Sequence, residues 1–193
     1  MAILGLFASP TQAKEDQDWH GLASAAASDV TQQPLNAKLL NRYGYYQYRA
    51  GVTDEAFNAY QRSLAIEPSY AVAWNNLGVL YLANEQYSEA QEAFEQALRH
   101  DEDYARAQFN LAVANFRQGS YYRALRLYLS VRRSNPEYVE SRSDEEMAQD
   151  EFERALRESP NDPVLRAVQR RLERENRAQD RRNAHSPFPG HYD

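Results

Sequence analysis

A repeat with a period of 34 residues is the feature that most constrains the fold of this chain. The segment SYAVAWNNLGVLYL (residues 69–82) aligns with DYARAQFNLAVANF (residues 103–116), and LNAKLLNRYGYYQY (residues 35–48) lies one period earlier. A constant period of this length is typical of supersecondary units that stack, each burying its apolar face against the next. The sequence therefore predicts an elongated array of similar units.

Positions one period apart share a side-chain type. Two columns are small and one is aromatic: Gly44, Gly78 and Ala112; Ala56, Ala90 and Ala124; and Tyr60, Phe94 and Tyr128. Two antiparallel helices approach closely only where side chains are small, and a large aromatic residue fills the gap toward the next pair. A proline column after the second helix stops helix propagation; it holds Pro34, Pro68 and Pro136, with Glu102 as the exception. Gly51 and Gly119 fall in the turn between two helices, where a left-handed backbone suits glycine.

One unit carries a recognisable motif. Trp74-x2-Leu77-Gly78-x2-Tyr81, followed by Ala90-x3-Phe94-x2-Ala97, resembles the motif of the tetratricopeptide repeat family. The departures of the neighbouring units from this motif include Leu40 and Gln108 in the Trp column, Asn115 in the Tyr column, and Ser63 in a small-residue column. The resemblance implies an all-α fold, a right-handed α-solenoid of helical hairpins with helical caps.

The repeat and its flanks predict five segments. They are a disordered N-terminus or signal-peptide remnant (1–17), an N-terminal capping helix (18–36), three repeats (37–70, 71–104 and 105–138), a truncated repeat with a C-terminal capping helix (139–182), and a disordered tail (183–193). Asp162 precedes Pro163 as a helix cap, and an apolar stripe follows at Val164, Leu165, Val168 and Leu172. We expect a helix from about Pro163 to Arg182 to cover the end of the stack.

The N-terminus has some features of an export signal. A short apolar run at residues 3–8 is followed by Thr11-Gln12-Ala13, just before charged residues. A small-residue ending of this kind is typical of a secretory cleavage site. We therefore expect a periplasmic or otherwise exported protein, and the alternative is a cytoplasmic protein with a disordered N-terminus.

Composition and motifs exclude several functional classes. The chain has no cysteine, which excludes disulfides and thiolate metal sites, and its net charge of -6 argues against general nucleic-acid binding. No stretch approaches the roughly 18 apolar residues that a membrane span needs. Phosphate-binding glycine motifs and zinc-protease or serine-hydrolase motifs are missing from the sequence. We expect neither an enzyme nor a bound cofactor or metal.

The resemblance points to one functional surface. In the family, the first helices of the hairpins line a concave face, which commonly receives a peptide or helix of a partner protein. The inner columns here predict a partner-binding groove made of Asn41, Tyr45, Tyr48, Asn75, Asn76, Val79, Leu82, Arg106, Phe109, Asn110, Val113, Phe116 and Arg117. Its amides suit a peptide backbone and its arginines suit a carboxylate.

Two points about this surface stay open at the level of sequence. Some family members clamp a terminal carboxylate, but only Asn76 and Arg106 match that set, so we do not expect this mode of recognition. The asparagines, and an aromatic residue such as Phe116, also suit purely structural roles.

Two functions of different kinds follow. The first is a non-catalytic scaffold or adaptor that binds a protein partner, within a bacterial envelope assembly. The alternative is a homo-oligomeric structural subunit, in which the acidic residues 144–153 of one copy attract the arginine-rich residues 166–182 of another.

Overall fold

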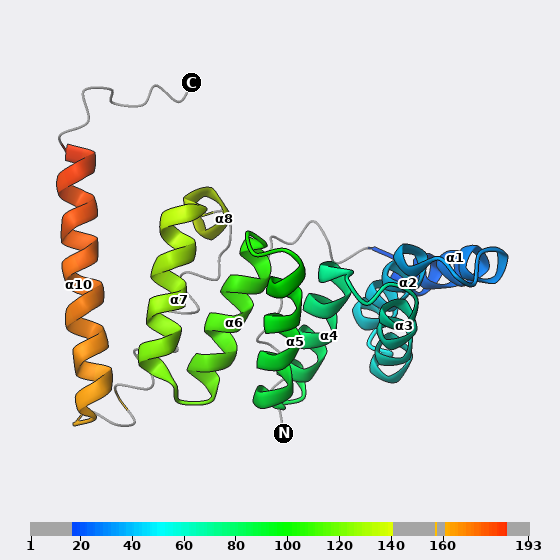
Figure 1. Cartoon of the computed structure of the whole chain (residues 1–193), viewed down its shortest axis with the longest axis horizontal. Coiled ribbons are helices and arrows are strands. Elements are labelled where there is room, and N and C mark those ends of the chain that lie inside the picture. Colours follow the sequence, from blue (N-terminus) through cyan, green and yellow to red (C-terminus); the bar gives the residue numbers. More distant parts are fainter. Residues whose placement is uncertain (1–16, 141–156, 158–160, 185–193) are drawn as a thin grey trace. The chain divides into compact units, whose positions relative to one another are not determined.

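The computed structural model describes residues 17–140, residue 157 and residues 161–184, and every regular element among them is a helix. Contacts divide the chain into two units, residues 1–145 and 146–193, and each is described by itself. The helices of the first unit, shown from blue to yellow-green in Figure 1, are α1 (Trp19–Gln32), α2 (Ala37–Arg49), α3 (Thr53–Ile66), α4 (Ala71–Ala83), α5 (Tyr87–His100), α6 (Ala105–Arg117), α7 (Tyr121–Ser134) and the short α8 (Pro136–Glu140).

Three antiparallel hairpins form the body of the first unit. They are α2–α3, α4–α5 and α6–α7, and α1 packs against α2 in the position that a preceding second helix would take. Their first helices begin at Ala37, Ala71 and Ala105, which reproduces the period of the sequence. The described residues thus confirm the predicted all-α array of helical hairpins.

Each hairpin turns through the same hydrogen-bonded motif. After α4, the amide of Glu85 donates to the Leu82 carbonyl (3.1 Å) and the amide of Gln86 donates to the Tyr81 carbonyl (2.9 Å). This pair of bonds is a Schellman motif, which needs a left-handed residue directly after the C-cap of the helix. Gly51 and Gly119 fill that position in the other two hairpins with φ of 81° and 84°, whereas Glu85 adopts φ of 60° without being a glycine.

The small columns are places of close helix approach. A Cβ atom on Gly78 would lie 2.5 Å from the Phe94 ring, and one on Gly44 would lie 2.7 Å from the Tyr60 ring. Each aromatic ring therefore packs on the glycine of its own hairpin. Tyr60 also belongs to a hydrophobic cluster that includes Leu77 and Leu80 of α4 in the next hairpin. In the third hairpin Ala112 occupies this column, and its aromatic partner Tyr128 is only half-buried.

Two departures from the repeat motif make specific bonds. The indole Nε1 of Trp74 donates to the Pro68 carbonyl (2.8 Å), and Gln108, in the same column, donates from Nε2 to the Glu102 carbonyl (2.6 Å). The fully buried Ser63 donates its hydroxyl to the Ala37 carbonyl (2.8 Å). These polar substitutes keep their backbone partners satisfied inside the array.

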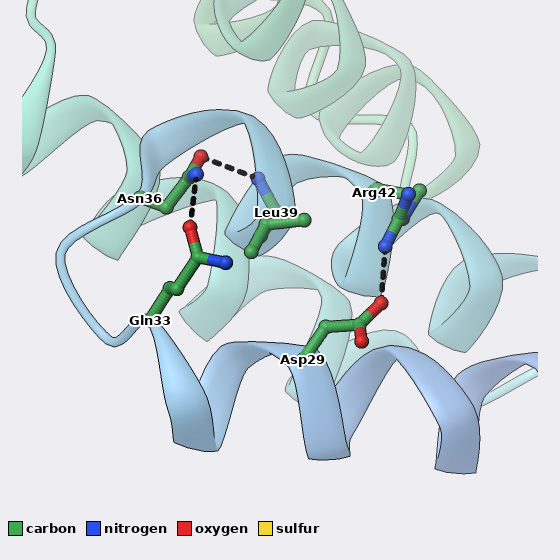
Figure 2. Close-up of polar contacts among 5 residues, drawn as sticks. All are labelled: Asp29, Gln33, Asn36, Leu39 and Arg42. Atoms are coloured by element: carbon green, nitrogen blue, oxygen red, sulfur yellow. Dashed lines mark hydrogen bonds and ion pairs between the residues drawn. The ribbon is translucent and has the colours of Figure 1, made fainter.

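Polar contacts order the connection between α1 and α2. Figure 2 shows that Asn36 accepts from the Leu39 amide (3.2 Å) as the cap of α2, while its amide nitrogen donates to Gln33 Oε1 (3.2 Å). Beside this cap, the Arg42 guanidinium of α2 pairs with the Asp29 carboxylate of α1.

An aromatic cluster makes a second contact between these two helices. The Arg49 guanidinium carbon lies 4.0 Å from the centroid of the Trp19 ring, and its Nη1 donates to the Tyr45 hydroxyl (3.0 Å). The Trp19 and Tyr45 rings meet edge to face, with centroids 6.2 Å apart. A cation over an indole face is favourable, so this cluster ties α1 to the array.

The second unit contributes helix α10 (Pro163–Ala184), which ends two residues beyond the predicted Arg182. Asp162 caps it as expected, because its carboxylate accepts from the amides of Val164 (2.7 Å) and Leu165 (3.0 Å). Leu165 and Val168 of the predicted apolar stripe are buried. The role of α10 as a cap of the array stays a prediction.

Candidate functional site

A chain of side-chain amides runs across the first helices of the three hairpins. Asn110 of α6 donates from Nδ2 to Asn75 Oδ1 of α4 (2.9 Å), and Asn76 of α4 donates to Asn41 Oδ1 of α2 (2.9 Å). Within α4, Asn75 Nδ2 lies 3.4 Å from Asn76 Oδ1, which closes the chain. These bonds, which we call the amide ladder, hold the three helices side by side in a fixed lateral register.

At each end of the ladder, the position that would continue it holds a residue other than asparagine. On α2 the position next to Asn41 is Arg42, which pairs with Asp29 of α1 instead of extending the ladder. On α6 the position next to Asn110 is Phe109, whose ring lies 6.2 Å from Tyr138 and 6.5 Å from Tyr128, centroid to centroid. The ladder thus begins at α2 and ends at α6.

The residues predicted to line a groove differ in accessibility. Five are buried, namely Asn41, Asn75, Leu82, Phe109 and Asn110. Seven are half-buried, namely Tyr45, Tyr48, Asn76, Val79, Val113, Phe116 and Arg117, and Arg106 is exposed. The half-buried and exposed residues are the ones that a partner can contact without repacking the array.

Specific neighbours account for this burial. Phe109 is 3% exposed because Val131, Tyr128 and Tyr138 surround it, so its ring belongs to the packing of the third hairpin. Asn75 is 1% exposed, and its amide is engaged on both sides within the ladder. These two side chains stabilise the packing of the helices and are not accessible to a partner.

The half-buried residues form rows across the helices. Tyr45, Val79 and Val113 occupy equivalent positions of α2, α4 and α6, and the same helices carry Tyr48 and Phe116 one turn further on. At the α2 end, Trp19 of α1 packs against the edge of the row. Burial raises the pKa of Tyr48, partly offset by the charge of Arg49, so its hydroxyl stays neutral and able to donate at physiological pH.

Hydrogen-bonding capacity remains next to these rows. Asn76 is half-buried, and its donation to Asn41 uses one of the two protons on Nδ2. Arg106 lies exposed in the first turn of α6. An extended peptide needs apolar contacts together with donors and acceptors for its backbone, and this surface offers both.

Two polar side chains inside the array, Gln108 and Asn115, were not predicted from the sequence to have buried atoms without a hydrogen-bond partner in the described part of the chain. Gln108 keeps the backbone bond of the Trp column. Its buried Oε1, and the buried Oδ1 of Asn115, have no hydrogen-bond partner among the described residues. Asn115 donates to the Leu111 carbonyl (2.7 Å) of its own helix. Each replaces a motif aromatic residue, and a departure from the motif is the one signal that points to them.

The remaining predictions from the sequence concern metal binding, membrane spans, export and oligomerisation. The described residues hold no group of three or more histidines and carboxylates that could bind a metal ion. None of the helices that they form is long and apolar enough to cross a membrane. The apolar run at residues 3–8 and the acidic residues 144–153 lie outside the described residues, so export and charge-driven oligomerisation stay predictions.

Comparison with known families assigns the repeat. Two family models described as tetratricopeptide repeats match the chain, one over residues 35–103 and the other over residues 75–139. The chain is a tetratricopeptide repeat protein. The two matches together span more than half of it and coincide with the three hairpins of the array, so the tetratricopeptide repeats are the part of the chain that carries the amide ladder.

One curated protein is similar to part of the chain. The uncharacterized protein ycf37 of Pyropia yezoensis is 44% identical over 45 residues, which cover 23% of this chain and 25% of that protein. The chain thus matches about a quarter of the length of this curated relative.

Two solved structures are similar in fold. A crystal structure of MamA matches with a TM-score of 0.60 and 19% identity, covering 84% of this chain and 92% of that one. A second MamA structure has a TM-score of 0.56 and 19% identity, covering 63% of this chain and 67% of that one. At these identities the likeness shows a shared tetratricopeptide repeat fold.

Proposed function

We propose that this protein is a non-catalytic scaffold that holds an extended peptide or a helix of a partner protein across α2, α4 and α6. The observation that carries the proposal is the row formed by Tyr45, Val79 and Val113, one half-buried side chain from each first helix, beside the amide ladder. The ladder fixes the spacing of the row, so the surface is organised before a partner arrives.

The energetics of such a surface suit a specific but reversible complex. Each apolar side chain that becomes fully buried contributes about 1.5–3 kcal/mol. Three or four anchors contribute about 4.5–12 kcal/mol in total, against an association cost of about 4–15 kcal/mol, so the apolar contacts reach the roughly 8 kcal/mol of a micromolar complex only at the favourable end of both ranges. Arg106, exposed at the start of α6, adds a site for a carboxylate of the partner.

Site-specific photo-crosslinking in the native host tests the proposal. A photoreactive amino acid at Arg106 or Val113 places the probe on the proposed face, and one at Glu92 or Gln61 places it on exposed positions of the second helices α5 and α3. We expect one discrete crosslinked protein from the first pair and none from the second. Crosslinks that form only from α3 and α5 contradict the proposed face.

Binding measurements then define the anchors. Once the partner is identified, we expect Arg106→Ala and Phe116→Ala to weaken its affinity, while Glu92→Ala leaves it unchanged. Equal affinity for all three variants eliminates this surface as the binding face.

We further propose that the protein acts after export, within an envelope assembly, on the basis of the apolar run and Thr11-Gln12-Ala13 near its start. Cell fractionation followed by N-terminal sequencing tests this. A mature protein that begins near Lys14 in the periplasmic fraction supports the proposal, and an uncleaved protein confined to the cytoplasm contradicts it.

A further inference from the structure

A hollow of about 380 Å³ opens where the first hairpin meets the second. It is formed by the start of α3, the end of α4 and the start of α5, and its lining residues are Thr53, Asp54, Phe57, Leu80, Tyr81, Asn84, Gln86 and Glu89. The rings of Phe57 and Tyr81 meet edge to face on its wall, with centroids 5.7 Å apart and planes at 78°. The hollow involves none of the residues proposed above to contact a partner, so it is a separate site.

Two of the residues that line this hollow carry carboxylates. Asp54 and Glu89 are both exposed, and in the part of the chain that the structure describes neither is paired with a cation. The contact of Glu89 is a long one, 3.4 Å from the neutral amide of Gln86. Burial raises the pKa of Tyr81, and the charges of Glu89 and Glu92 raise it further, so the negative potential extends to the Tyr81 hydroxyl.

The next junction of the same array provides an internal comparison. Thirty-four residues further along, the equivalents of Asp54, Phe57, Tyr81, Asn84 and Glu89 are Ser88, Gln91, Asn115, Gln118 and Arg123. There Gln118 donates from Nε2 to the Ser88 hydroxyl (3.1 Å) and accepts at Oε1 from Gln91 (2.6 Å). Polar side chains of the protein therefore bridge this space.

Charge differs between the two junctions in the same way. Where the first junction has Glu89, the second has Arg123, which pairs with Glu95 at 2.7 Å. The fold thus does not require aromatic walls or unpaired carboxylates at a junction, because the second junction packs without either. The first junction has the walls and charges of a cation site, and its carboxylates have no cationic partner among the described residues.

We propose that the hollow at the first junction binds the guanidinium group of an arginine side chain of a partner protein. A guanidinium stacks on aromatic faces and forms paired hydrogen bonds with carboxylates, so one group satisfies both kinds of lining residue. Arginine suits the site better than lysine because its planar, weakly hydrated head loses less on entering a partly enclosed aromatic hollow. Phe57 and Tyr81 form the stacking wall, and Asp54 and Glu89 accept the hydrogen bonds.

Titration of the full-length protein with the tripeptide acetyl-Gly-Arg-Gly-amide, followed by amide NMR, tests this site. We expect saturable shifts confined to residues 53–57 and 80–89. Asp54→Asn and Glu89→Gln are each expected to weaken binding about 3- to 10-fold, which corresponds to about 0.7–1.4 kcal/mol. Glu55→Gln is the matched control, because Glu55 is an exposed neighbour of Asp54 that does not line the hollow, and it is expected to leave binding unchanged.

Two further peptides define the chemistry. The same tripeptide with citrulline keeps the shape of arginine without its charge, and the one with lysine keeps the charge without the planar head. We expect both to bind more weakly than the arginine peptide. Equal binding of the citrulline peptide, equal binding of the lysine peptide, an equal loss in Glu55→Gln, or shifts that do not saturate would each overturn the proposal.

Discussion

Replacing Glu85 by glycine should stabilise the protein. Glu85 holds the left-handed position of the Schellman turn with φ of 60°, where the equivalent hairpins have Gly51 and Gly119. A non-glycine residue in this region is destabilised by roughly 1–2 kcal/mol. Glycine offsets about 0.4–1 kcal/mol of that through the greater freedom of the unfolded chain. We therefore expect Glu85→Gly to raise the free energy of unfolding by about 0.5–1 kcal/mol.

The array supplies the controls for this measurement. Glu85→Gln removes the charge but keeps the side chain, so it separates electrostatics from backbone strain. Gly51→Ala makes the reciprocal change, and a Cβ atom there would meet no other atom within 4 Å, so its effect comes from the backbone alone. We expect it to destabilise the protein by about 1 kcal/mol.

Urea unfolding of the three variants, followed by circular dichroism, decides the matter. If Glu85→Gly is no more stable than Glu85→Gln, or if Gly51→Ala is as stable as the parent protein, the strain argument is refuted.

Three other predictions concern the core, the ladder and the alkaline range. In urea unfolding, Gly78→Ala should lower the free energy of unfolding by about 1 kcal/mol. A Cβ atom 2.5 Å from the Phe94 ring overpacks the core at a cost of about 1–3 kcal/mol, and the better helix propensity of alanine offsets about 1 kcal/mol of this. A variant more stable than the parent protein would show that the ring moves freely. Asn75→Ala should cost about 1–3 kcal/mol in the same assay, because it leaves the donor of Asn110 unpaired, and a neutral result would argue against the ladder. Burial, with smaller contributions from Tyr48 and Tyr45, raises the pKa of Tyr60. The contribution of this group to stability should therefore be constant below pH 10, the ordinary tyrosine pKa, and fall above it by about 1.4 kcal/mol per pH unit. Tyr60→Phe should make that fall shallower in unfolding curves between pH 9 and 12, and an unchanged slope contradicts the assignment.

Periodicity and local sterics made much of the fold predictable. The glycine and aromatic columns predicted close helix approach, and the structure places Gly78 against Phe94 and Gly44 against Tyr60. These features depend on few atoms and on neighbours within one repeat. The sequence therefore contains almost all the information needed to place them.

Features that depend on exceptions to the motif were not predictable. The identity of Glu85 does not predict a left-handed turn, because a glutamate side chain does not favour that backbone conformation. Gln108 forms the backbone bond of the tryptophan it replaces, and this follows only when the position of the Glu102 carbonyl is known. In both cases tertiary context overrides what the residue type favours.

The sequence predicts which residues share the inner columns, but it does not predict how accessible each of them is. Periodicity assigns Phe109 to an inner column, but it does not reveal that Val131 and Tyr138 cover its ring. The amide ladder joins positions that are 35 residues apart, an offset of one residue from the period. That offset results from the packing of whole hairpins, which a column alignment does not contain.

The amide ladder also determines how the number of hairpins can change. The hairpin of α4 carries asparagine at both ladder positions, Asn75 and Asn76, so it can join a neighbour on either side. An inserted copy of residues 71–104 would find a matching amide before and after it, and deleting those residues would bring Asn110 next to Asn41. A copy of the first or last hairpin would instead place Arg42 or Phe109 inside the ladder and interrupt it. Growth and shortening of this protein by gene duplication or deletion should therefore occur at its middle hairpin.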